Sequence, residues 1–194
     1  MMQKTYLFAA AVVALTAVGV MALVSTSQGQ GTTIKSGPQA GEKLAGPFHP
    51  LNCNGKSEGK KNCLYCENGL NPVAMVFARD NTPEVAKLIK AIDAATVKHA
   101  DWDMGSFVVF LSDKEALPQQ LTDLAKTEKL QKCVLSVDNP AGPEGYNVAK
   151  EAAVTVVLYR NRTAVVNHTY RSASDLNEKA IQEIINDVSK IQPK

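Results

Sequence analysis

The sequence lacks the motifs that carry several common activities. It has no glycine-rich phosphate-binding loop, no nucleophile elbow and no paired-carboxylate pattern. It also has no basic stripe interleaved with aromatic residues, and aromatics make up only 6% of the chain. Nucleic acid is therefore not an expected partner. The net charge of +2 is too small to indicate any other charged partner.

Cysteine is scarce but placed in a pattern: the chain has only Cys53, Cys63, Cys66 and Cys133. None of them directly follows the apolar run near the N-terminus, so lipid attachment there is not expected. Cys66 is followed by Glu67 and not by histidine, which excludes covalent haem attachment by motif. The sequence gives no reason to expect a cofactor.

The first thirty residues have the composition of an export signal. Lys4 lies in a short polar start, residues 6–24 form an apolar run, and small polar residues follow up to position 30. Residues 1–30 are thus predicted to be a signal peptide or, because the run is about long enough to span a bilayer, an uncleaved N-terminal anchor. The protein is expected to be exported, periplasmic or secreted, and to meet a membrane only if residues 6–24 remain attached.

The rest of the chain divides by composition into three stretches. Residues 31–47 are rich in Gly, Ser, Thr, Gln and Lys and predict a flexible linker. Residues 48–72 carry three of the cysteines between turn residues and predict an irregular segment. Together with the regular part that follows, they form one predicted domain over residues 48–194, long enough to bury a core without disulfides.

From position 73 onward the hydrophobic pattern becomes regular. The continuous apolar run 73–78 is typical of a strand that is covered on both faces. Thr82 and Pro83 then provide a cap and a first-turn proline for a helix. The same reasoning predicts further strands at 107–111 and 133–137, and a helix that begins at Ser112 or Asp113.

The C-terminal part has a different order. Residues 154–159 and 163–170 are apolar strands separated by three residues, as in an antiparallel hairpin. A last amphipathic helix is predicted from about Ser174. The order β-α-β-α-β followed by β-β-α predicts an α/β fold with a parallel half and an antiparallel hairpin unit.

Local motifs resemble the C-terminal half of thioredoxins. They are Val137-Asp138-Asn139-Pro140, Tyr146-Asn147-Val148 and the hairpin sequence over residues 154–161. The resemblance implies a thioredoxin-like three-layer sandwich with a mixed sheet. Residues 48–72, with Cys63-Leu64-Tyr65-Cys66 ahead of the first strand, also resemble exported thioredoxin-like proteins of planctomycete-type bacteria.

The sequence departs from thioredoxins at the usual redox site. In that family the Cys-x-x-Cys motif follows the second strand at the start of a helix, where the helix N-terminus lowers the pKa of the attacking thiol. Here the corresponding residues are 112–116, which include no cysteine. The family's cis-proline position is expected at Val154, preceded by Ala153. Activity at the usual site is therefore not implied.

The resemblance instead implies a cysteine cluster at the opposite end of the sheet. In a thioredoxin-like sheet the first and third of these strands are expected to be parallel neighbours. Cys63 and Cys66 precede the first strand and Cys133 begins the third, so the three are expected to approach one another. Cys53 is expected to reach them from the upstream loop.

Three interpretations of the four cysteines remain open. In the first, Cys63 and Cys66 exchange disulfides with a protein thiol partner, Cys63 attacking and Cys66 resolving. In the second, Cys53, Cys63, Cys66 and Cys133 form structural disulfides, and the domain is a binding or structural module. In the third, Cys63 and Cys66 bind zinc together with Cys53 and either Cys133 or His49. Of these, a metal site is the least expected.

Overall fold

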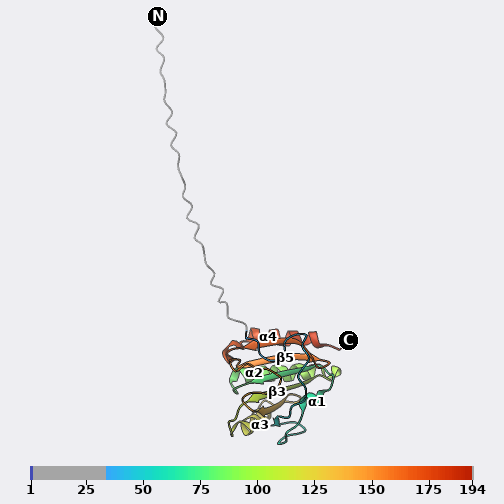
Figure 1. Cartoon of the computed structure of the whole chain (residues 1–194). Coiled ribbons are helices and arrows are strands. Elements are labelled where there is room, and N and C mark those ends of the chain that lie inside the picture. The colour runs from blue at the N-terminus through green and yellow to red at the C-terminus, as the bar shows by residue number, and fades with distance from the viewer. Residues whose placement is uncertain (2–33, 194) are drawn as a thin grey trace. The chain divides into compact units, whose positions relative to one another are not determined.

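The structure is a computed structural model that describes Met1 and residues 34–193 (Figure 1). The predictions for residues 1–30, including the apolar run at 6–24, lie outside the described residues. Among the residues that are described, no helix is both long enough and apolar enough to cross a membrane.

A single six-stranded sheet organises the described chain, with the strand order β1-β4-β3-β2-β5-β6. β2, β3 and β4 are parallel, whereas β1, β5 and β6 each run antiparallel to the strand they pair with. The mixed sheet that the sequence predicts is therefore confirmed. Its strands are β1 (Leu51–Asn52), β2 (Val73–Ala78), β3 (Gly105–Leu111), β4 (Val134–Asp138), β5 (Val154–Arg160) and β6 (Thr163–Tyr170).

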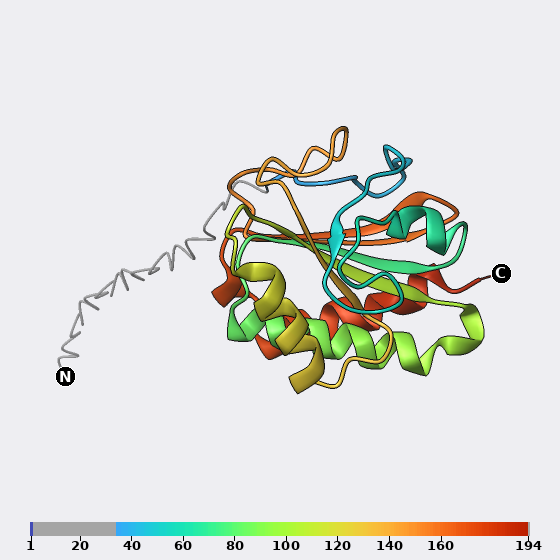
Figure 2. The ribbon, with the colours of Figure 1, turned by 90° about the horizontal axis from the view of Figure 1, so that it is seen from below.

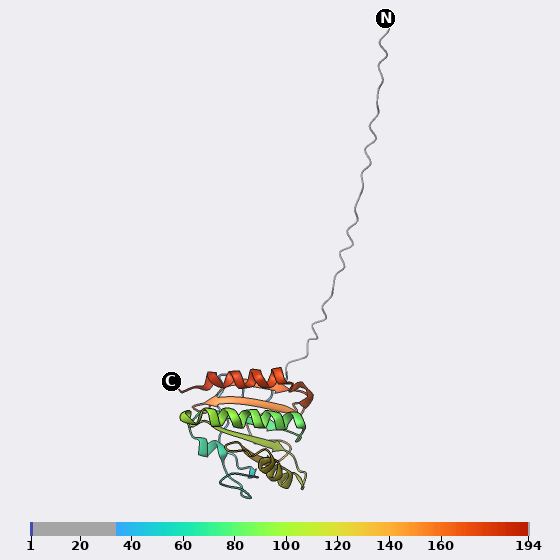
Figure 3. The same ribbon diagram turned by 180° about the vertical axis from the view of Figure 1, so that it is seen from behind.

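The three longer helices cover one face of the sheet, and irregular segments with one short helix cover the other (Figures 2 and 3). Because the chain advances from β2 to β3 to β4 in one direction, right-handed crossovers place α2 and α3 on the same face. The helices are α1 (Leu64–Asn68), α2 (Pro83–Lys98), α3 (Leu117–Thr127) and α4 (Glu178–Asp187), with 3-10 turns η1 (Ala100–Trp102), η2 (Ala173–Asp175) and η3 (Val188–Ile191).

The central strand β2 divides two apolar cores. Every residue of this strand is buried, as its continuous apolar run predicts. Since side chains alternate across a strand, Ala74 and Val76 join the core beneath α2, α3 and α4. Val73 and Met75 join the core on the other face, together with residues from α1 and the irregular segments.

The position of β2 corrects the expected strand order. The first and third regular strands, β2 and β4, are not neighbours, because β3 lies between them. β2 instead lies at the centre of the sheet beside the hairpin strand β5. The helix that follows the central strand is therefore α2, so the position assigned to the usual redox site moves from residues 112–116 to residues 79–83.

The predicted linker is also wrong for its described part. Ser36 is fully buried and its hydroxyl lies 2.6 Å from Thr155 Oγ1, and Leu44 belongs to the second apolar core. The backbone of Gly41 donates to Ala164 on β6. Polar composition suggested a free chain, but here the polar groups bond to the sheet. The packed domain thus extends to at least residue 34 and does not begin at residue 48.

Two short elements occur inside the segment 48–72 that the sequence predicts to be irregular. They are β1, which extends the sheet beyond β4, and the five-residue helix α1. Helix α3 begins at Leu117, several residues after the predicted caps Ser112 and Asp113. β1 and α1 have too few residues to show a hydrophobic period, so the sequence does not indicate them.

The C-terminal end of α1 rests against the first residue of β3. The Asn68 amide donates to Leu64 O at 2.7 Å, and its oxygen occupies the space where a side chain at position 105 would begin. Only glycine leaves this space open. Gly105 therefore sets the distance between the short helix and the sheet.

We expect Gly105→Ala to lower the free energy of unfolding by about 1–3 kcal/mol, the usual range for overpacking a filled site. The new methyl group would displace the Asn68 amide. Urea unfolding measures the effect, with Asn68→Ala and the double variant as controls. The double variant should be more stable than Gly105→Ala alone; if it is equally or less stable, the contact does not limit the position of α1.

Candidate active site

A disulfide joins Cys63 and Cys66 at the start of α1. Cys63 is the N-cap residue, and its sulfur accepts a hydrogen bond from the Cys66 backbone N–H at 3.1 Å. The carbonyl of Cys63 also accepts from the N–H groups of Cys66 and Glu67. The predicted Cys-x-x-Cys pair is thus a local bridge within one helical turn.

The two bridged cysteines differ in exposure. Cys63 is 5% exposed and belongs to the apolar core on its side of the sheet, whereas Cys66 is exposed. Leu64 and Tyr65 are buried beside Cys63, and Glu67 is exposed beside Cys66. The disulfide therefore links the inner face of α1 to its outer face. These exposures do not favour the roles expected from the sequence, in which Cys63 attacks and Cys66 resolves.

The tip of the β5–β6 hairpin holds the end of α1. The guanidinium of Arg162 lies over the Tyr65 ring, 4.9 Å from its centroid, and its Nε donates to Gly69 O. The Asn161 N–H donates to Leu70 O at 3.1 Å. Asn161 and Arg162 both have positive φ, as a tight two-residue hairpin turn requires. These contacts join residues far apart in sequence, so no local pattern could have indicated them.

A hollow of about 460 Å³ adjoins this end of α1. Its lining includes Leu70, Pro72, Trp102 and Arg160. Leu70 is 60% exposed and is the one large apolar residue in this state between positions 34 and 193. Apolar surface is thus open to solvent four residues after Cys66.

The other two cysteines lie on the opposite face of the sheet. Cys53 and Cys133 are free thiols, buried in the core beneath α2, α3 and α4. The Cys53 N–H donates to Leu135 O at 2.8 Å, so this residue extends the pairing of β1 with β4. The predicted cluster of all four cysteines is therefore wrong, because the sheet separates Cys63 from Cys53 and Cys133.

Buried groups fix Cys133 at the start of β4. The carboxylate of Asp93 on α2 accepts from the backbone N–H groups of Gln131, Lys132 and Cys133 at 2.7–3.2 Å. The Asn54 amide donates to Cys133 O at 3.0 Å across the strand pair. Cys133 is only 1% exposed as a result.

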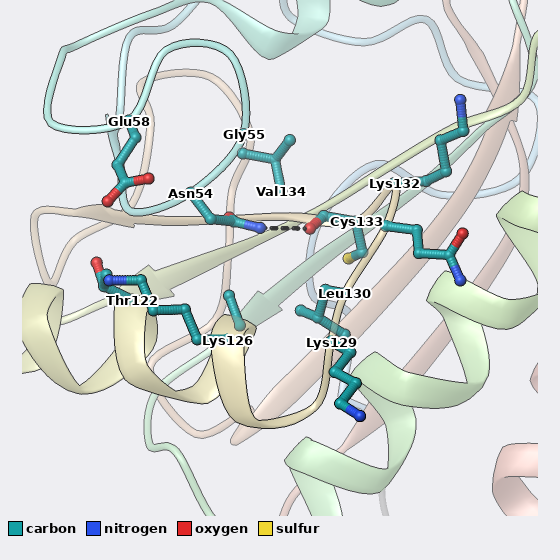
Figure 4. A pocket seen from close by; sticks show the side chains of 12 residues that line it. Asn54, Gly55, Glu58, Thr122, Lys126, Lys129, Leu130, Lys132, Cys133 and Val134 are labelled. Atoms are coloured by element: carbon teal, nitrogen blue, oxygen red, sulfur yellow. Dashed lines mark hydrogen bonds between the residues drawn. The ribbon is translucent and has the colours of Figure 1, made fainter.

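A pocket of about 370 Å³ lies above Cys133 and is drawn in Figure 4. The side chains of Lys126, Lys129 and Lys132 surround it, and Asn54 spans it to the Cys133 carbonyl. Burial nevertheless raises the pKa of the Cys133 thiol to about 12, with a further contribution from the Asp93 charge. A thiol with this pKa is not a nucleophile at neutral pH.

Cys53 is in a similar state. Burial raises the pKa of its thiol to about 11, and the Glu58 charge acts in the same direction. Its S–H points to Leu51 O, and its own carbonyl accepts from the Thr122 hydroxyl at 2.7 Å. The structure thus gives this cysteine a packing role.

We expect Cys53 and Cys133 to resist alkylation in the folded protein. Iodoacetamide at pH 8 should leave both unmodified, because few thiolates form and little sulfur is exposed. Both should react in urea. Mass spectrometry of peptides from the two samples measures the difference. Rapid native labelling of Cys133 would show that the pocket opens to reagent.

The buried thiols also predict a loss of stability at high pH. An unfolded cysteine releases its proton near its ordinary pKa of 9.0, whereas folded Cys133 keeps it up to about 12. Unfolding between these values therefore releases a proton, and the free energy of unfolding falls by up to about 1.4 kcal/mol per pH unit. Urea unfolding at pH 8 and pH 10.5 tests this, with Cys133→Ala as the comparison. Equal pH slopes for the two proteins would contradict it.

The opposite end of β2, where the chain enters α2, contains no cysteine in residues 79–83. Arg79 fills this end instead. Its guanidinium donates to Ala152 O, Pro140 O and Ala149 O at 3.0–3.1 Å. The described chain has no cis peptide bond, including the bond before Val154. This end of the sheet is held closed by hydrogen bonds.

No family model matches the chain, and no match is found among curated proteins. Solved structures of other proteins are similar to the structure of this chain. A "putative protein disulfide isomerase" from Bacteroides thetaiotaomicron gives a TM-score of 0.62 at 16% identity, covering 83% of this chain and 96% of its own. The thioredoxin domain of a thiol-disulfide oxidoreductase from Bacteroides vulgatus gives 0.52 at 11%, covering 79% and 100%. Peroxidoxin BcpB from Mycobacterium tuberculosis gives 0.54 at 13%, covering 83% and 100%.

These similarities confirm the predicted thioredoxin-like fold. At such low identity they show the fold alone. Function has to be argued from the site, because one fold supports many activities.

Proposed function

We propose that this protein carries out thiol–disulfide exchange or redox sensing through Cys63 and Cys66. The observation that carries the proposal is the exposure of Cys66, which is bridged to the buried Cys63, whose sulfur accepts a hydrogen bond. A reducible disulfide needs one accessible sulfur and a stable position for the other. α1 supplies both.

The small size of the bridge argues against a purely structural role. Cys63 and Cys66 are three residues apart, and closing so short a loop stabilises a fold by about 2 kcal/mol, against about 4 kcal/mol for a loop of many tens of residues. The bridge joins Cys66 only to the residue that caps its own helix, so it does not attach α1 to another element. The alternative of a binding module with cysteine staples requires bridges from the segment 48–72 to the sheet, and Cys53 and Cys133 are free thiols.

A zinc site is also poorly supported. Cys63 and Cys66 are joined to each other, and Cys53 and Cys133 lie across the sheet from them. Across the described positions, no three His, Cys, Asp or Glu side chains are gathered to hold a metal ion. The sulfur chemistry of the pair therefore favours redox exchange.

The partner in this proposal is a thiol or disulfide of another protein. The hollow lined by Leu70 and Trp102 is close to Cys66 along the chain and offers apolar surface for a partner's side chains. We place the reaction outside the cytoplasm, as the apolar run at residues 6–24 predicts. The similar structures described as disulfide isomerase or thiol-disulfide oxidoreductase are consistent with this proposal.

The proposal predicts a labile bridge. In glutathione redox buffers the Cys63–Cys66 pair should equilibrate at a potential of about −120 to −270 mV, the range of disulfide oxidoreductases. Alkylation followed by mass spectrometry measures the reduced fraction at each buffer composition. Cys53 and Cys133 serve as internal controls, because their state should not change. A bridge that stays intact under thioredoxin-strength reductant would contradict the redox function and favour a structural one.

A further inference from the structure

We infer that Cys66, the second cysteine of the motif, is the sulfur that forms the mixed disulfide with the partner. This inference rests on the proposed function and assigns roles within it. It reverses the order expected from sequence, in which Cys63 attacks and Cys66 resolves.

The first argument is access. In thiol–disulfide exchange the incoming thiolate must touch the sulfur that it attacks and forms a mixed disulfide with it. Cys66 is exposed on the outer side of α1, whereas Cys63 is 5% exposed among the side chains of the apolar core. The partner can therefore reach Cys66 without any change in the fold, but it cannot reach Cys63.

The second argument is the leaving group. When a partner thiolate attacks Cys66 Sγ, the Cys63–Cys66 bond breaks and its electron pair passes to Cys63 Sγ. The Cys66 N–H already donates to that sulfur at 3.1 Å, and a hydrogen bond of this kind strengthens when its acceptor becomes an anion. Within the described chain, no donor contacts the Cys66 sulfur, and exposed Glu67 follows it. This hydrogen bond offsets part of the desolvation cost of placing negative charge on the buried Cys63 sulfur, so access decides which sulfur is attacked.

The full exchange balances with two partner thiols. The first joins the partner to Cys66 and releases Cys63 as a thiolate, which takes up a proton. The second thiolate of the partner then attacks the partner's first sulfur, which is bonded to Cys66 in the mixed disulfide. Cys66 leaves as a thiolate and takes up a proton. The partner is oxidised by two electrons to a disulfide, and the Cys63–Cys66 pair is reduced to a dithiol. In the opposite direction Cys66 attacks the partner's disulfide and Cys63 resolves the intermediate.

Trapping the mixed disulfide in the unmodified protein tests the inference. The oxidised full chain is mixed with equimolar glutathione, quenched in acid and cleaved with chymotrypsin, which cuts after Tyr65 and separates the two cysteines. Glutathione should be found on Cys66. Glutathione on Cys63 would overturn the inference and leave the proposed exchange activity in place. If neither cysteine carries glutathione and the bridge also resists dithiothreitol, the proposed function itself fails.

Two serine variants provide a matched comparison. Cys63→Ser leaves Cys66 as a free thiol and keeps an oxygen at the cap position, and Cys66→Ser leaves the buried Cys63. With oxidised glutathione, Cys63→Ser should form an adduct at least about tenfold faster, because the rate depends on access to the sulfur. Equal rates, or a faster reaction of Cys66→Ser, would overturn the assignment. Circular dichroism and urea unfolding verify that both variants are folded.

Discussion

The complete burial of β2 is the constraint on which the rest of the molecule depends. A strand with no exposed residue must be covered on both faces and paired along both edges, and β3 and β5 provide the pairing. The chain reaches this strand from α1 through only four residues, 69–72. The position of the cysteine pair is therefore set by the strand that is least free to move.

Alternation across the sheet then separates the cysteines into two chemical states. Cys53 and Cys133 lie under the long helices, where burial keeps their thiols protonated and closed to solvent. The other face is covered by loops and by a helix of five residues, and such a cover can bring one residue to the surface while burying its neighbour. On this face Cys63 is buried and Cys66 is exposed. The exposure of each cysteine thus follows from the kind of layer that covers it.

The sequence allowed the elements to be predicted, but not all of their relations. Continuous apolar runs identified β2 and the hairpin, and capping residues identified the start of α2 at Thr82, because these signals are local. The order of the parallel strands was wrong, since right-handed crossovers are compatible with β2 at the edge or at the centre of the sheet. That one error moved the expected position of the usual site and created the expected cysteine cluster. Arg162 contacts Tyr65 and Gly69 at the two ends of α1. These residues are far from Arg162 in sequence, so no periodic pattern could predict the contacts.

The direction in which the chain crosses the sheet connects the fold to the placement of its chemistry. Because β2, β3 and β4 follow one another in space, right-handed crossovers place α2 and α3 on one face, where α4 also packs, and segments without long helices cover the other face. Much of the segment 34–72 covers that face, together with the loop that carries Tyr146, and it brings Cys63 and Cys66 with it. At the opposite end of β2, Arg79 binds three carbonyl groups and closes the position where a dithiol would need open space. The side chain of Arg79, and not the topology, therefore closes the start of α2, whereas the segment ahead of β2 has room for the proposed redox pair.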